Sequence, residues 1–238
     1  MRAVFLAFRR YIEGILDDYM LIACSIAPII MVVAFHFAIP ALEQYLCDAF
    51  STKAILSPYY LIFDLLIAVM TPVMFSFSGV MATLEEIDNG TAYYLMVTPI
   101  GKSGYIASRI GLPALIAVPY SIILMAVLGL SGMSLLMNIA ISFLCAVTGI
   151  IVSIFVIAFA NNKVEGMALI KMSGIIVLGI PAVFFLPTPI LYICGILPSY
   201  WYTIMAKSQN YLYALPAVTI SVIWLFLIYR KFSRKLLG

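Results

Sequence analysis

Two ionisable side chains, His36 and Asp64, stand inside long apolar stretches of this 238-residue sequence. An imidazole and a carboxylate can form an ion pair, exchange a proton or bind a charged ligand. Burying either group inside a membrane costs roughly 2.5–3.5 kcal/mol on insertion scales, so each needs a partner. Counted from the outer ends of their spans, His36 is about three residues deep and Asp64 about six. Both therefore lie within roughly 10 Å of the outer surface, where a contact between them is one alternative. Two interpretations stay open: a polar point on a substrate pathway, pH-sensitive through His36, or a structural role, as a pair or as side chains that reach the wet outer vestibule.

The composition indicates that membrane helices hold these side chains. Hydrophobic residues make up 65% of the chain and charged residues 10%, against roughly 45–50% and about 25% in soluble domains. This balance excludes a soluble globular domain, a disordered chain and a disulfide-stapled secreted module. The net charge of +3 is too small to indicate a nucleic-acid partner. We therefore predict an integral membrane protein of the cell membrane, with the lipid bilayer as its surroundings.

Six stretches have the roughly 20 apolar residues that a helix needs to cross a bilayer. They are 19–39, 58–79, 108–130, 135–160, 168–186 and 212–229. The predicted fold class is all-α integral membrane, with residues 19–238 forming one six-helix transmembrane domain. The segment 187–211 contains three prolines, so we expect it to be re-entrant, dipping into the outer leaflet before the last helix.

Residues 1–18 are too short and too charged to cross the membrane. Their apolar residues recur at helical spacing, with arginines and acids on the opposite side, which predicts an amphipathic helix in the cytoplasmic interface. It is either a plain anchor or an elbow helix that transmits motion to the first span.

The placement of Lys and Arg predicts that both termini lie inside. In that orientation all of these residues except Lys53 and Lys207 fall in inner segments. Cys47 and Cys194 then both lie outside, where a disulfide between them is one alternative. The four cysteines form no C-x-x-C pair, and they form no cluster with the single histidine at the spacing of metal ligands. We therefore expect no metal site.

The inner loop 81–103 has the pattern of a structured protrusion. Three acids, Glu85, Glu86 and Asp88, lead to Asn89-Gly90, a turn signal. Thr91 is expected to cap a short helix over 92–97, which Pro99 ends. The apolar side chains that this helix would present to a partner are Tyr93, Tyr94, Leu95 and Met96.

The run Glu86-x-x-x-Gly90-Thr91, followed by Thr98-Pro99, resembles the signature loop of ABC-2-type transporter permeases. Members of that family have six spans, an N-terminal interfacial helix and a broken, proline-containing segment before the last span. The resemblance implies the permease subunit of an ABC exporter, working as a homodimer or as a heterodimer with a related permease. It also implies that Glu85, Glu86, Gly90, Thr91 and Pro99 couple the permease to a separate ABC ATPase subunit.

ATP and magnesium are expected in that partner subunit, because this chain lacks a phosphate-binding loop. Gly101-Lys102-Ser103 has Met96 where the first glycine of such a loop would stand. We therefore predict a transport subunit and not an enzyme. The inner loop 161–167 is the second surface that an ATPase could grip.

Other function classes have less support. An ion-coupled transporter working without an ATPase would need charged sites near the midplane, and an intramembrane enzyme would need a catalytic set that one histidine and one deep acid do not supply. Short outer loops favour a hydrophobic drug, antibiotic or peptide as the substrate. Ser142, Ala146, Gly149 and Ser153 make one small-residue face, which we expect to pack within the chain, ahead of a dimer seam.

Overall fold

The computed structural model describes residues 19–98 and 101–236, and every regular element in these ranges is helical. The predicted interfacial helix at 1–18 and the coupling residue Pro99 lie outside the described residues. The first half comprises α2 (Tyr19–Phe50), η1 (Ser57–Tyr59), α3 (Tyr60–Asp88), α4 (Thr91–Val97), α5 (Gly101–Ile106), the π-helical turn η2 (Ala107–Gly111) and α6 (Leu112–Leu128).

The second half begins with α7 (Leu135–Phe159) and α8 (Lys163–Ser173). It continues with η3 (Gly174–Leu178), α9 (Gly179–Phe185), α10 (Thr188–Leu191), η4 (Tyr192–Ile196), α11 (Pro198–Ser208), η5 (Tyr211–Tyr213) and α12 (Ala214–Leu236). Six helical stretches are long and apolar enough to cross a membrane. The predicted number and order of spans are therefore confirmed by length and composition.

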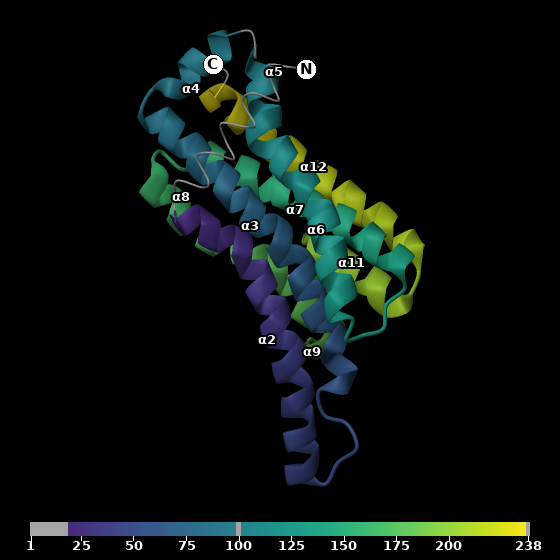
Figure 1. The fold of residues 1–238 in the computed structure, drawn as a ribbon. Helices are drawn as coiled ribbons and strands as arrows, with labels where there is room; N and C mark the ends of the chain where they lie inside the picture. The colour runs from purple at the N-terminus through teal and green to yellow at the C-terminus, as the bar shows by residue number, and fades with distance from the viewer. Residues whose placement is uncertain (1–18, 99–100, 237–238) are drawn as a thin grey trace.

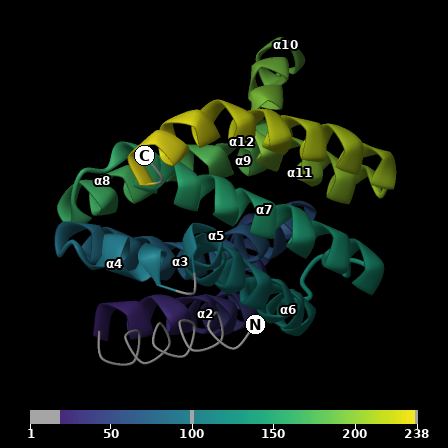
Figure 2. The same ribbon diagram turned by 90° about the horizontal axis from the view of Figure 1, so that it is seen from above.

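The helices pack in layers around α3 and α7. Seen from above, α2 and α6 lie on one side, α3 and α7 in the middle, and α12 with α9 and α11 on the other side (Figure 2). In the spans that contain α3 and α7, 67% of the most apolar 18-residue stretch is buried inside the protein. In the spans that contain α2 and α12, the buried share of that stretch is 17%. The two central spans thus form the core, and the apolar outer faces of α2 and α12 are left to lipid or to a partner chain.

The predicted small-residue face is part of this core. Ser142, Ala146, Gly149 and Ser153 are all buried. A Cβ at Gly149 would lie 2.8 Å from Ser76 Oγ and 3.0 Å from the Pro72 carbonyl oxygen. Only a residue without a side chain lets α7 approach α3 this closely. The expectation of packing within the chain is confirmed.

The first span extends 11 residues beyond its predicted end at Ile39. The helix passes through Pro40, and α2 runs on to Phe50. The residues after Pro40 are mostly good helix formers, so the helix continues after losing one hydrogen bond. The lower part of α2 and its connection to α3 project beyond the rest of the molecule (Figure 1).

One carboxylate holds this projecting connection in place. Glu43 accepts hydrogen bonds from the backbone N–H groups of Ile55, Leu56 and Ser57, at 3.1, 2.6 and 3.3 Å. The Ser57 hydroxyl donates to it at 2.6 Å. The chain therefore folds back against α2 as a defined hairpin before α3 begins.

The proline-containing segment 187–211 forms short helices in place of one long span. Pro198 starts α11, which packs against α9 and α12. Tyr202 and Met205 of α11 are fully buried, so protein covers the α11 part of this segment. In contrast, α10 projects from the bundle (Figure 2).

Candidate functional site

The α3–α4 turn has the predicted form of an acid-bearing helix, a glycine turn and a short apolar helix. Asn89 caps the C-terminus of α3, and Gly90 adopts a φ of 72°. This left-handed backbone costs other residues about 1–2 kcal/mol, which explains why glycine stands at the turn. The turn sends α4 across the end of the bundle, as Figure 1 shows.

Thr91 has a different role from the predicted cap. It is the first residue of α4, and its hydroxyl donates a hydrogen bond of 3.1 Å to the carbonyl oxygen of Glu86. The last carbonyl groups of a helix lack partners within the helix. Thr91 therefore satisfies the end of α3, and the prediction that its side chain caps α4 is wrong.

One side of α4 is exposed and the other is anchored. Tyr93, Tyr94 and Val97 are exposed, whereas Ala92 and Met96 are buried against the bundle. The prediction that Tyr93 and Tyr94 face outward is confirmed, and the same prediction for Met96 is wrong. An isolated helix of seven residues is not stable in water, so this packing fixes α4 as a firm apolar surface.

Glu86 points inward and holds the base of the next span. Its Oε2 accepts hydrogen bonds from the Tyr105 hydroxyl at 2.7 Å and from Arg109 Nε at 3.1 Å. Arg109 Nη2 also contacts Glu86 Oε1. Arg109 is buried within η2, and its guanidinium lies 6.0 Å from the centroid of the Tyr105 ring. We call Glu86, Tyr105 and Arg109 the Glu86 brace.

Glu85 and Asp88 reach the opposite way, to the start of α8. Lys163 Nζ lies 2.8 Å from Glu85 Oε2, and the Lys163 backbone N–H donates to Asp88 Oδ2 at 3.1 Å. An acid at a helix N-terminus also interacts favourably with the helix dipole. These groups are exposed to solvent, unlike the Glu86 brace.

The predicted second grip, 161–167, becomes the start of α8. Asn162 caps it by accepting from the Glu165 N–H at 2.9 Å. Gly166 allows α8 to pack closely against α3, because a Cβ at this position would lie 2.3 Å from Leu84 Cδ1. The acidic end of α3 therefore contacts both α5–α6 and α8, so three elements meet at one end of the bundle.

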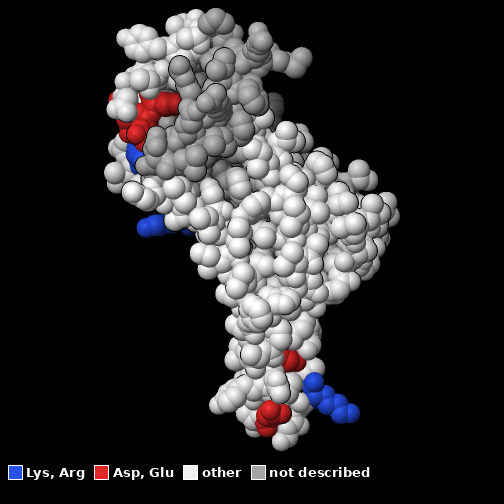
Figure 3. Space-filling view, in the orientation of Figure 1, with Lys and Arg blue, Asp and Glu red and all other residues white. Residues whose placement is uncertain are grey.

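Charged residues lie towards the two ends of the molecule. On the face drawn in Figure 3, a belt without Lys, Arg, Asp or Glu separates the acids near α4 from those of the α2–α3 hairpin. Such a belt is the surface that a hydrocarbon layer requires.

Asp64 lies near the other end of α3, and only 2% of it is exposed. Its carboxylate accepts from the backbone N–H groups of Leu130 at 3.3 Å and Ser131 at 2.8 Å, and from the Ser131 hydroxyl. Gly129, with a φ of 52°, turns the α6–α7 loop towards it. His36 is exposed on α2, its ring 5.3 Å from that of Phe37. The predicted His36–Asp64 contact is not made.

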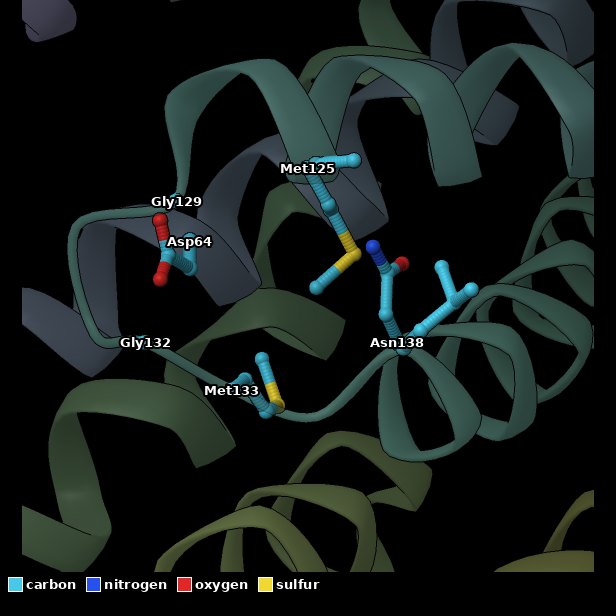
Figure 4. A pocket seen from close by; sticks show the side chains of 8 residues that line it. Asp64, Met125, Gly129, Gly132, Met133 and Asn138 are labelled. Atoms are coloured by element: carbon cyan, nitrogen blue, oxygen red, sulfur yellow. The ribbon is translucent and has the colours of Figure 1, made fainter.

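A cavity of about 180 Å³ opens beside Asp64. Met125, Met133 and Asn138 form its other walls (Figure 4). A larger cavity of about 520 Å³ shares Gly132 and Met133 with it and reaches Lys207. The sequence did not reveal these cavities, because the α6–α7 loop that lines them has no recognisable motif.

The four cysteines are free thiols in this structure, including Cys47 and Cys194. The disulfide considered for that pair is therefore not formed.

The sequence matches the family described as Fluoroquinolones export permease protein Rv2686c-like over residues 11–229. This match covers most of the chain. The protein belongs to the Rv2686c-like family. The matched range includes the α3–α4 turn, the Glu86 brace and both cavities.

Two relatives of the Rv2686c-like family come from Mycobacterium tuberculosis. They are the fluoroquinolones export permease protein MT2760 of strain CDC 1551 / Oshkosh and the fluoroquinolones export permease protein Rv2686c of strain ATCC 25618 / H37Rv. Each is 24% identical over 195 residues, which cover 81% of this chain and 77% of the relative. No solved structure matches this chain. The chain is thus a multi-pass membrane protein homologous to export permeases, which are transport proteins.

Proposed function

We propose that this protein is the transmembrane subunit of an ATP-driven ABC exporter whose substrates are antibiotics of the fluoroquinolone kind. Two copies, or one copy and a related permease, enclose the pathway. A separate ABC ATPase subunit binds ATP and magnesium. The observation that carries this proposal is α4: a short apolar surface, anchored on the bundle at the end of α3, whose acids make polar contacts with two neighbouring elements.

In this proposal the α4 end lies in the cytoplasm, with both termini inside. All Lys and Arg residues except Lys53 and Lys207 then belong to inner segments, as the positive-inside rule requires. The α2–α3 hairpin, the α6–α7 loop and the re-entrant segment 187–211 face the outside. The Asp64 cavity then lies at the exit end of the pathway.

The contacts of α3 explain how a push on α4 reaches the spans. Movement of α4 displaces the end of α3, and the Glu86 brace passes that displacement to Arg109 at the base of α6. Glu85 and Asp88 pass it to α8 through Lys163. Packed helices and buried ion pairs transmit strain because they deform little.

The test is co-purification in mild detergent of the tagged chain with its partners, identified by mass spectrometry. We expect a stoichiometric ABC ATPase with the wild type. Tyr94→Asp should abolish that association, because it places a charge on the exposed side of α4. Tyr45→Asp is the matched control: Tyr94 and Tyr45 are 74% and 71% exposed and stand at opposite ends of the molecule.

Two results would contradict the proposal. One is equal loss of the ATPase in both variants, which would indicate a general defect and not a docking surface. The other is a wild-type chain that purifies without any ATPase across several detergents. An ion-coupled transporter would then become the better interpretation, with His36 and Asp64 as the residues to study.

A further inference from the structure

The charge on Asp64 is not balanced by a positive side chain. The carboxylate is almost fully buried within an apolar bundle. Its hydrogen-bond donors are two backbone N–H groups and one hydroxyl, all neutral. Within residues 19–98 and 101–236, no Lys, Arg or His forms an ion pair with it. Buried charges in proteins are normally paired with an opposite charge.

The carboxylate also keeps an unused acceptor position. Its two oxygens offer about four lone-pair sites, and three hydrogen bonds occupy three of them. The group lines an open cavity and not a packed wall. A donor that entered the cavity would therefore meet a free acceptor position on the carboxyl group.

The rest of the cavity wall is mostly apolar, and none of the residues that line it is Lys, Arg or His. The Asn138 side chain is held by its neighbours: its Nδ2 donates to the Ile122 carbonyl at 3.2 Å, and its oxygen accepts from the Ser142 hydroxyl at 3.4 Å. The Met125 and Met133 side chains add polarisable sulfur, a weak acceptor. Figure 4 shows these side chains around one space with Asp64. An ammonium group, with donors and no acceptor, has the complementary chemistry.

We propose that Asp64 binds the protonated amine of an amphiphilic substrate, whose aromatic body fills the adjoining larger cavity. The smaller cavity, about 180 Å³, suits one amine-bearing group. The larger one, about 520 Å³, lies within the usual range of ligand pockets and shares Gly132 and Met133 with the first. This inference rests on the proposed function and specifies its substrate class: antibiotics with a basic amine.

The alternative role for Asp64 is to hold the α6–α7 loop and nothing more. Two variants separate the roles. Asp64→Asn removes the charge and keeps one oxygen that can accept from the Ser131 N–H. Ser131→Ala removes a loop contact and leaves the charge. A loop-holding role predicts similar effects of both variants, whereas an amine site predicts an effect of Asp64→Asn alone.

The experiment is equilibrium dialysis of the purified full-length chain with two probes, so that no ATPase is needed. One probe is a fluoroquinolone with a basic piperazine nitrogen, and the other is the same molecule acetylated at that nitrogen. We expect the wild type and Ser131→Ala to prefer the basic form by about tenfold or more, the usual effect of a hydrogen bond to a charged group. Asp64→Asn should bind both forms alike.

Met133→Lys provides a second variant that leaves the carboxylate intact. Its ammonium would occupy the cavity and compete with the probe, so it should also lose the preference for the basic form. A variant counts as folded when its thermal unfolding midpoint is close to that of the wild type. One folded variant, Asp64→Asn or Met133→Lys, is enough for the test.

Three outcomes overturn the amine site. The wild type binds both probes alike, Asp64→Asn or Met133→Lys keeps the preference, or Ser131→Ala loses it as fully as Asp64→Asn. In each of these cases, a wild-type chain that still binds the acetylated probe remains able to bind antibiotics, so the proposed export function is not overturned. A wild-type chain that binds neither probe overturns the amine site and the antibiotic substrate together.

Discussion

The two ends of α3 carry acids in opposite situations. At the α4 end, Glu86 meets a buried guanidinium and Glu85 meets an ammonium. At the other end, the described donors to Asp64 are all neutral, and a cavity lies beside the carboxyl group. The first arrangement is complete and fixes one geometry, so it suits a mechanical connection. The second keeps an unfilled position, so it suits a ligand. One helix thus joins a rigid base to a receptive site.

The largest expected effect tests the rigid base. Arg109→Ala leaves the Glu86 carboxylate without its guanidinium partner, and we expect a loss of about 3 kcal/mol in the free energy of unfolding. Asp64→Asn should cost less, because the amide can still accept from the Ser131 N–H. Thermal or denaturant unfolding in detergent measures both.

The double variant Arg109→Ala/Glu86→Ala is the control for that prediction. Removing both charges should recover part of the lost stability, since no uncompensated charge remains. If Arg109→Ala unfolds like the wild type, the Glu86 brace is not a rigid element and the contrast between the two ends disappears.

A second prediction concerns the close packing beside the brace. A Cβ on Gly79 would lie 2.2 Å from the carbonyl oxygen of Arg109, a backbone atom that cannot rotate away. Gly79→Ala should therefore destabilise the fold by about 1–3 kcal/mol. Gly111→Ala is the matched control, with no atom within 4 Å of its Cβ. Equal unfolding midpoints for the two variants would show that α3 and η2 are not held together as described.

The turn at Gly90 gives a smaller effect on stability and a larger one on coupling. Nothing lies within 4 Å of a Cβ at this position, so the cost of Gly90→Val is backbone strain alone, about 1–2 kcal/mol. We expect membrane insertion to be retained while ATP hydrolysis by the partner no longer drives export. Gly90→Asn, which tolerates the left-handed region, should keep export. Pro99→Ala is expected to behave like Gly90→Val, and normal transport in both would remove the coupling role.

The smallest effect belongs to the exposed pair. Lys163→Ala should cost at most about 1 kcal/mol, because solvent screens the Lys163–Glu85 interaction. Raising the salt concentration should reduce the difference between this variant and the wild type. A loss as large as that of Arg109→Ala would mean that burial does not distinguish the two contacts.

Local patterns predicted the spans and the α3–α4 turn because both depend on neighbouring residues. Apolar length gave the six spans, and Asn89-Gly90 gave the turn. The partners of Glu86 and Asp64 depend on how helices pack. Arg109 follows Glu86 by 23 residues, and Ser131 follows Asp64 by 67. His36 was considered as a partner of Asp64 because the two residues lie at comparable depth in the membrane. Depth does not fix the direction in which a side chain points, and His36 is exposed on α2.

In the proposed orientation, the length of α2 has a consequence for how the protein is seen from outside the cell. Its 32 residues rise about 48 Å, whereas the hydrocarbon core of a bilayer is about 30 Å thick. The Glu43-bound hairpin therefore stands in water as a short post, with Lys53 exposed near its tip. An antibody fragment raised against that post can mark the protein on intact cells without entering the proposed pathway.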